Sequence, residues 1–183
     1  MTAIPKLSYE AISPQLRQQL DPRVKRLGYF GEFFQYAAHQ PEILSAFLTM
    51  TEAFQTALSG RVIEVCALTV SGALKNDYER NQHEQLCLRL GLSKEWVADV
   101  NKLSPDTASS LDAIDCAVQR LCLGLVERRG NEINSELNAV VELLSADKAI
   151  AILFVVGRYV THALFVNALM LSPPVKSIFT EAV

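Results

Sequence analysis

Ionisable side chains suited to proton transfer gather between residues 64 and 83 of this 183-residue chain. Glu64 is the one charged residue within an apolar stretch, and His83 follows nineteen residues later. A carboxylate beside an imidazole can accept or donate a proton near neutral pH. Glu79 lies four residues before His83, so on a helix these two side chains share a face. Glu64, Glu79 and His83 are therefore the candidate catalytic residues.

The chain must fold back between Glu64 and His83 for these side chains to meet. On one continuous helix they would be about 28 Å apart at 1.5 Å per residue. Asn76, with Glu79 three residues later, has the spacing of a capping box, which predicts that a new helix begins there. We therefore expect a helix break within residues 74–78 and the two side chains within direct or one-water reach.

Structural explanations compete with these catalytic ones. Glu64 could form a buried ion pair with Arg61, and the capping box explains Glu79 without any chemistry. Asn76 is more readily a helix cap than a catalyst. Tyr78 could donate a hydrogen bond into a pocket or pack the joint between two helices. Cys87, one turn after His83, fits an ordinary buried thiol better than a reactive one.

Helix signals recur along the chain, and strand signals are nearly absent. Gly91 and Gly130 follow periodic segments as helix stops, and Pro173 ends the last long one. The expected helices span residues 28–38, 42–58, 60–75, 77–90, 94–103, 108–129, 132–144 and 147–171. The sequence thus predicts an all-α fold of about eight helices. The prolines at positions 5, 14 and 22 predict an N-terminal arm over residues 1–27, followed by one domain over residues 28–183.

Composition narrows the possible partners and compartment. A formal net charge of −3 without a run of Lys or Arg argues against nucleic acid as the main partner. The first ten residues lack the apolar core of a signal peptide. None of the four cysteines forms a Cys-x-x-Cys pair or a paired metal-ligand spacing, which predicts reduced thiols in the cytoplasm and no metal site. The cysteines are Cys66, Cys87, Cys116 and Cys122.

The stretch from Ala149 to Leu171 is apolar enough to suggest a membrane span. Arg158 and His162 lie near its middle, where hydrocarbon would penalise them heavily, so a buried core helix is expected and no membrane contact. Arg158, Tyr159 and His162 could line a cavity or pair with Glu64. They more readily satisfy each other or a subunit interface.

The segment from Gly60 to Ser93 resembles the carboxymuconolactone decarboxylase / alkyl hydroperoxidase D-like superfamily. That superfamily has an Arg-x-x-Glu at the start of one helix, then a Cys-x-x-Cys-x-x-x-His twelve residues after the Glu. The residues in these positions here are Arg61, Glu64, Asn76, Glu79 and His83. Asn76 and Glu79 thus occupy the two cysteine positions, as in a branch without the thiol pair. Weaker similarity covers His39–Leu44, Gly157–Tyr159 and Asn167–Ala168.

The resemblance implies a fold, an assembly and a chemistry. It implies an alkyl hydroperoxidase D-like domain that assembles as a homotrimer or a hexamer. It implies a cofactor-free enzyme in which Glu64, Glu79 and His83 transfer protons on a small lactone or carboxylate. Its substrate-binding residues would be Asn76, Tyr78, Arg80 and Arg158. Two alternatives remain: peroxidase activity of the peroxiredoxin type, disfavoured because neither Asn nor Glu can cycle through a disulfide, and a non-catalytic oligomeric ligand-binding protein.

Overall fold

Nine α-helices and one 3-10 turn make up the secondary structure of the computed structural model, which describes residues 3–180. No strand occurs within that range, so the expected all-α class is confirmed, with one helix more than expected. By its internal contacts the chain divides into two units, one ending at Ala53 and the other beginning at Phe54. This boundary differs from the predicted one, which separated an arm at residue 27 from a single domain.

The first unit holds the extra helix. It contains η1 (Tyr9–Ala11), α1 (Pro14–Leu27), α2 (Glu32–Ala37) and most of α3 (Pro41–Ala57). The side chain of Ser13 accepts a hydrogen bond from Leu16 N, and Pro14 occupies the first turn, where its missing N–H costs nothing. Gly28, with φ 81°, ends the helix. The prolines at positions 14 and 22 therefore lie in a helix, which the sequence analysis did not expect.

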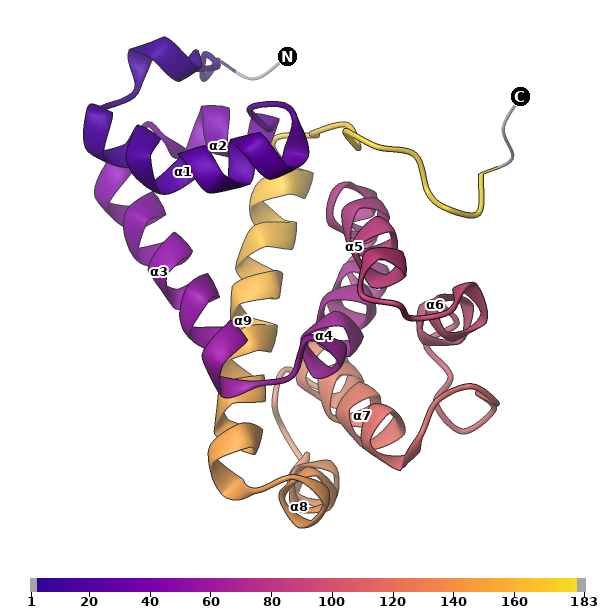
Figure 1. Ribbon diagram of the computed structural model, residues 1–183. Helices are drawn as coiled ribbons and strands as arrows, with labels where there is room; N and C mark the ends of the chain where they lie inside the picture. Colours follow the sequence, from indigo (N-terminus) through magenta and orange to yellow (C-terminus); the bar gives the residue numbers. More distant parts are fainter. Residues whose placement is uncertain (1–2, 181–183) are drawn as a thin grey trace. The chain divides into compact units, whose positions relative to one another are not determined.

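The second unit is built around α4 (Gly60–Ala73). Nine of its fourteen residues are buried, which places α4 at the centre of this unit's core. It contacts α5 (Asp77–Arg89), α6 (Lys94–Asn101), α7 (Ala113–Glu127) and α9 (Ala146–Ala168), as Figure 1 shows. The remaining helix, α8 (Asn134–Leu143), contacts α7 and α9. Every side chain predicted to act in catalysis or binding lies on α4, α5, α9 or the α4–α5 joint.

One buried carboxylate joins the starts of three helices in this unit. Asp115 accepts a hydrogen bond from Arg61 Nε at 3.0 Å and one from Trp96 Nε1 at 2.8 Å. Asp115 also completes a capping box with Asp112 at the start of α7. Arg61 therefore pairs with Asp115 of α7, and the suggested ion pair between Arg61 and Glu64 is wrong.

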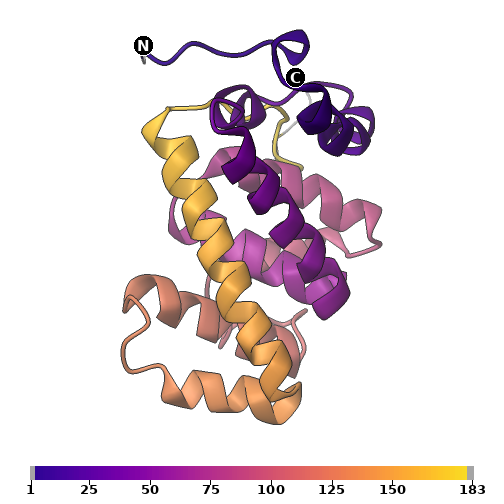
Figure 2. The ribbon, with the colours of Figure 1, turned by 90° about the vertical axis from the view of Figure 1, so that its left-hand side faces the viewer.

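The long helix α9 runs along one side of the second unit, starting beside α8 (Figure 2). It is long and apolar enough to cross a membrane by length and composition, and 44% of its most apolar window is buried inside the protein. Its buried face includes Tyr159 and His162, which lie toward α4 and α5. One face of α9 thus belongs to the core of this unit.

Candidate active site

The joint between α4 and α5 reverses the chain between the two predicted catalytic residues. α4 ends at Ala73, and Lys75 adopts a left-handed conformation with φ 54°. Asn76 then caps α5, because its side-chain oxygen accepts a hydrogen bond from Glu79 N at 3.2 Å. The predicted break within residues 74–78 is confirmed, and it lets α5 return alongside α4.

Glu64 and His83 form the centre of the site. His83 Nδ1 lies 2.7 Å from Glu64 Oε2. The Glu64 side chain is 3% exposed and that of His83 is 14% exposed, so the pair is shielded while the imidazole keeps an outlet to solvent. The predicted contact between these two side chains is confirmed, without an intervening water.

Glu79 contacts three basic side chains with its carboxylate. Oε1 lies 3.2 Å from His83 Nε2 and 2.9 Å from Arg158 Nη1, while Oε2 contacts His162 Nδ1. Asn76 caps the Glu79 N–H, whereas the Glu79 carboxylate makes these inward contacts. Capping alone therefore does not explain Glu79.

The two carboxylates control the protonation of His83. Burial by itself would lower the pKa of His83, but the charges and hydrogen bonds of Glu64 and Glu79 outweigh burial and raise this pKa from 6.5 to about 9. Burial has the opposite effect on a carboxyl group and would raise the pKa of Glu79. His162, Arg158 and His83 nevertheless hold this pKa well below 4.5. At neutral pH, His83 is thus an imidazolium ion and Glu79 a carboxylate.

α9 contributes two groups that the sequence analysis did not count as site residues. Tyr159 Oη lies 3.5 Å from His83 Nε2, and the two rings meet edge to face with centroids 5.3 Å apart. Burial raises the pKa of Tyr159 well above 10, so its hydroxyl keeps its proton. Burial also lowers the pKa of His162, despite the opposing effect of Glu79. The feature of the sequence that could have identified Tyr159 and His162 is the cluster of polar residues 158, 159 and 162 on one side of an apolar helix.

Three of the four predicted binding residues contact the cluster, and Arg80 does not. Asn76 Nδ2 lies 3.5 Å from His162 Nδ1, and the Tyr78 ring centroid lies 6.0 Å from that of His162. Arg158 binds Glu79. Arg80 instead pairs with Asp77 at 2.8 Å and approaches the buried Glu84 at 3.8 Å. The prediction that Arg80 lines the same pocket as His83 therefore has no support in this geometry.

Cys87 lies against the same carboxylate oxygen that binds His83. Its thiol donates to Glu64 Oε2 at a distance of 3.6 Å, and the side chain is fully buried. Burial, followed by the negative charge of Glu64, raises the pKa of the Cys87 thiol. A protonated, inaccessible thiol is a poor nucleophile. Cys87 therefore acts here as a hydrogen-bond donor to Glu64.

The arrangement of the helices matches that of known structures. It resembles the alkylhydroperoxidase AhpD core of an uncharacterized peroxidase-related protein from Ralstonia eutropha JMP134, with a TM-score of 0.78, 19% identity, and 94% of each chain covered. The chain has the AhpD fold. It also resembles the debrominase Bmp8 without ligand, at a TM-score of 0.77 and 13% identity, over 94% of this chain and 92% of that chain.

The chain also resembles a cysteine-to-alanine variant of Bmp8 in complex with 2,3,4-tribromopyrrole. The TM-score is 0.76 at 13% identity, over 94% of this chain and 91% of the Bmp8 chain. No protein-family model and no curated protein matches the sequence. At these identities the similarity establishes the fold, and the activity has to be argued from the side chains.

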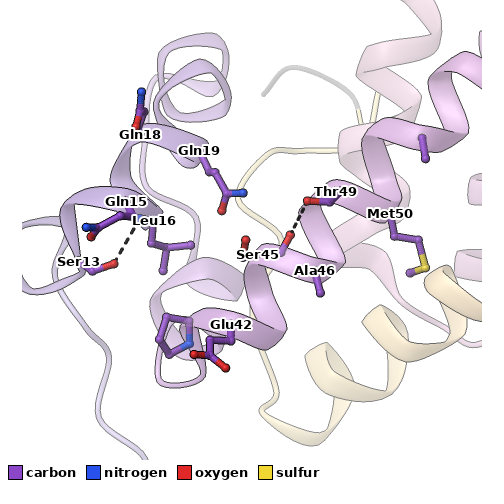
Figure 3. Close-up of a pocket in the computed structure, with 12 residues that line it drawn as sticks. Ser13, Gln15, Leu16, Gln18, Gln19, Glu42, Ser45, Ala46, Thr49 and Met50 are labelled. Carbon is purple, nitrogen blue, oxygen red and sulfur yellow. Dashed lines mark hydrogen bonds between the residues drawn. The ribbon is translucent and has the colours of Figure 1, made fainter.

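An open groove of about 1030 Å³ lies in the first unit, and none of its lining residues belongs to the Glu64–His83 cluster. It runs between α1 and α3, as Figure 3 shows, and its lining is mostly small and amide side chains such as Gln15, Gln19, Ser45 and Thr49. This lining offers hydrogen bonds but no nucleophile or proton carrier with an adjacent base. Within residues 3–180, no group of three or more His, Cys, Asp or Glu side chains could hold a metal ion.

The cluster combines the elements of a proton-transfer site. His83 carries a proton, Glu64 orients the imidazole through Nδ1, and Nε2 lies toward Glu79 and Tyr159. Carboxylates on both nitrogens stabilise the charged imidazole, so His83 holds a proton at neutral pH that it could give to a reacting group. A reacting group would have to approach from the Nε2 side.

Proposed function

We propose that this AhpD-fold chain is an enzyme that transfers a proton to a small organic substrate, with His83 as the proton donor. The observation that carries the proposal is the 2.7 Å contact between His83 Nδ1 and the buried Glu64 carboxylate. It fixes the imidazole and keeps it charged at the pH of the cell interior. A positioned general acid of this kind contributes about 10²–10⁴-fold to a rate.

The site has a proton donor and no thiol pair. This combination fits the decarboxylation of a small carboxylate or a reaction of a small lactone. As the carbon–carbon bond to the carboxylate breaks, the electron pair stays on the substrate and carbon dioxide leaves. His83 then gives its proton to that carbon and regains one from solvent. Asn76, Tyr78 and Tyr159 are the polar neighbours available to orient the substrate.

The charge of the cluster limits the substrate. Glu64 and Glu79 are balanced by His83 and Arg158, so a bound molecule meets a site close to electrical neutrality. A substrate carboxylate would have to compete with Glu79 for Arg158. We therefore favour a weakly charged molecule with at most one carboxylate. The small brominated pyrrole bound by the Bmp8 variant is an example of a small organic ligand on this fold.

Peroxidase activity is the less favoured alternative, although the Ralstonia eutropha protein is called peroxidase-related. A thiol peroxidase needs an accessible thiolate. Cys66, Cys87 and Cys122 are buried, and Cys87 is held protonated beside Glu64. A non-catalytic ligand-binding role has one observation in its favour, which is that Glu64, Glu79, His83 and Arg158 all find partners within the chain.

Turnover in deuterium oxide tests the proposal. The full chain is incubated with a panel of small lactones and 3-oxo carboxylates, and products are examined by NMR for one deuteron on the carbon that lost the carboxylate. We expect His83→Gln and Glu64→Gln to lower turnover by at least about 10²-fold, in line with the loss of a general acid. His39→Gln, which removes an imidazole outside the cluster, should leave turnover unchanged.

Full turnover by His83→Gln would refute the role of His83. Folded protein without turnover on any member of the panel would favour the non-catalytic alternative. Loss of turnover in Cys87→Ser, whose hydroxyl can still donate to Glu64, would instead restore a thiol mechanism.

A further inference from the structure

A continuous uncharged stripe runs along the outer face of α9. We define the α9 stripe as six residues that are all solvent-exposed: Ile150, Phe154, Gly157, Thr161, Leu164 and Ala168. Its three large side chains are 52%, 62% and 61% exposed, in chain order. Large apolar side chains left in solvent along a whole helix mark an interaction surface.

The spacing of the α9 stripe suits packing against another helix. Its members follow one another at intervals of four, three, four, three and four residues, which average close to the 3.5-residue repeat of a helix–helix seam. Between Ala149 and Met170, the one Asp, Glu, Lys or Arg is Arg158, and it binds Glu79. The outer face therefore offers no charge that would have to lose its hydration in such a contact.

Gly157 gives a second, independent indication that a helix approaches this face. Glycine in the middle of a helix is unfavourable relative to alanine. A Cβ atom at Gly157 would meet no heavy atom of the described residues within 4 Å, so packing within the chain does not require glycine there. A neighbouring backbone at this point would require it. Thr161 Oγ1 already donates to Gly157 O at 2.9 Å, so its hydroxyl can be buried without losing a partner.

The order of residues along the α9 stripe is self-complementary in the antiparallel direction. With a two-fold axis level with Tyr159, Phe154 of one copy lies opposite Leu164 of the other. The same operation sets Ile150 opposite Ala168, and Gly157 opposite Thr161 at the crossing point. Each contact then occurs twice, as two-fold symmetry requires.

We propose that two copies of this chain associate through an antiparallel two-fold contact between their α9 stripes. Met170, 74% exposed just after α9, extends the apolar surface at the end of the stripe. Together with Ile150, Phe154 and Leu164 it offers roughly 500 Å² per copy, or about 1,000 Å² for two copies, which reaches the lower bound of a specific interface. The proposal rests on α9 and Met170 and is independent of the catalytic proposal.

A charge-pair rescue tests both the surface and its register. The mass of the full-length protein is measured by light scattering at micromolar concentration. We expect at least twice the 20.2 kDa of one chain for the wild type. Phe154→Lys and Leu164→Glu should each lower this mass at least two-fold. When the two variants are mixed, one Lys–Glu pair and one native Phe154–Leu164 pair form, so the larger mass should return.

Leu88→Lys is the matched control, because Leu88 is 42% exposed on α5 and lies outside the α9 stripe. It should keep the wild-type mass, and circular dichroism should show all variants folded. A monomeric wild type, an unchanged mass for Phe154→Lys, or two monomeric variants that fail to associate on mixing would each overturn the proposal. A wild type that is monomeric but co-sediments with phosphatidylcholine vesicles would show that the α9 stripe meets lipid instead.

Discussion

Glu64 Oε2 lies 2.7 Å from Nδ1 of His83, although the two residues are nineteen positions apart and on different helices. The contact directs Nε2 toward Glu79 and Tyr159 and so defines the side from which a substrate can be protonated. The same contact explains why the imidazole of His83 stays protonated although it is buried. An imidazole taken out of water without a carboxylate partner would lose its proton more readily.

The first prediction concerns the titration of His83. In imidazole-detected nitrogen NMR, His83 should titrate with a pKa of about 9 in the wild type. Glu64→Gln should shift this pKa downward, because it removes the nearest negative charge and leaves burial unopposed on that side. The signals of His39 should not respond to Glu64→Gln. An unchanged His83 titration in this variant would show that Glu64 does not hold the proton.

The second prediction concerns stability against pH. The folded pKa of His83, about 9, lies above its ordinary value of 6.5, so its stabilising contribution is fully present below pH 6.5 and is lost as pH rises through 9. The shift corresponds to at most about 3 kcal/mol. Urea unfolding at pH 6 and pH 9.5 should therefore show a smaller stability gap between wild type and His83→Gln at the higher pH. A gap that does not change with pH would contradict the raised pKa.

The third prediction concerns the ion pair between Arg158 and Glu79. Both side chains are largely buried, so Arg158→Met should lower the free energy of unfolding by about 3–5 kcal/mol, the cost of leaving a buried charge without its partner. The double variant Glu79→Gln/Arg158→Met should cost less than the sum of the single variants. Arg120→Met is the control, because its pair with Asp106 is solvent-exposed and worth about 1 kcal/mol or less. Equal losses from the two arginine variants would argue against the buried pair.

The fourth prediction concerns the thiols. Cys66, Cys87 and Cys122 are buried, whereas Cys116 is half-buried, so iodoacetamide should label Cys116 first under native conditions. Labelling of Cys87 should be slow and should accelerate in urea, because burial both shields its thiol and raises its pKa. Mass spectrometry of peptides after timed labelling measures each rate. Rapid native labelling of Cys87 would show that its environment is open and would reopen the question of a reactive thiol.

The sequence by itself determined the features that depend on local interactions. Recurrent caps and stops predicted the all-α class and most helices to within a few residues, because a cap acts within one turn. The spacing of Asn76 and Glu79 predicted the break before α5. Once that break was placed, the return of the chain brought Glu64 and His83 together.

Tertiary structure alone decided which polar residues of α5 face the cluster. This helix buries polar side chains on more than one side: Glu79 meets Arg158 and His162 of α9, while Glu84 accepts hydrogen bonds from Asn101 and Ser177. Apolar periodicity indicates which face of a helix packs against the core. It gives no such indication when both faces are polar and both are covered by other parts of the protein. The partner of Glu79 lies 79 residues further along the chain at Arg158, a separation that no local spacing rule can bridge. For this reason the sequence could identify Glu79 as important, while its contacts, and the pairing of Arg80 with Asp77, depended on the packing of the helices.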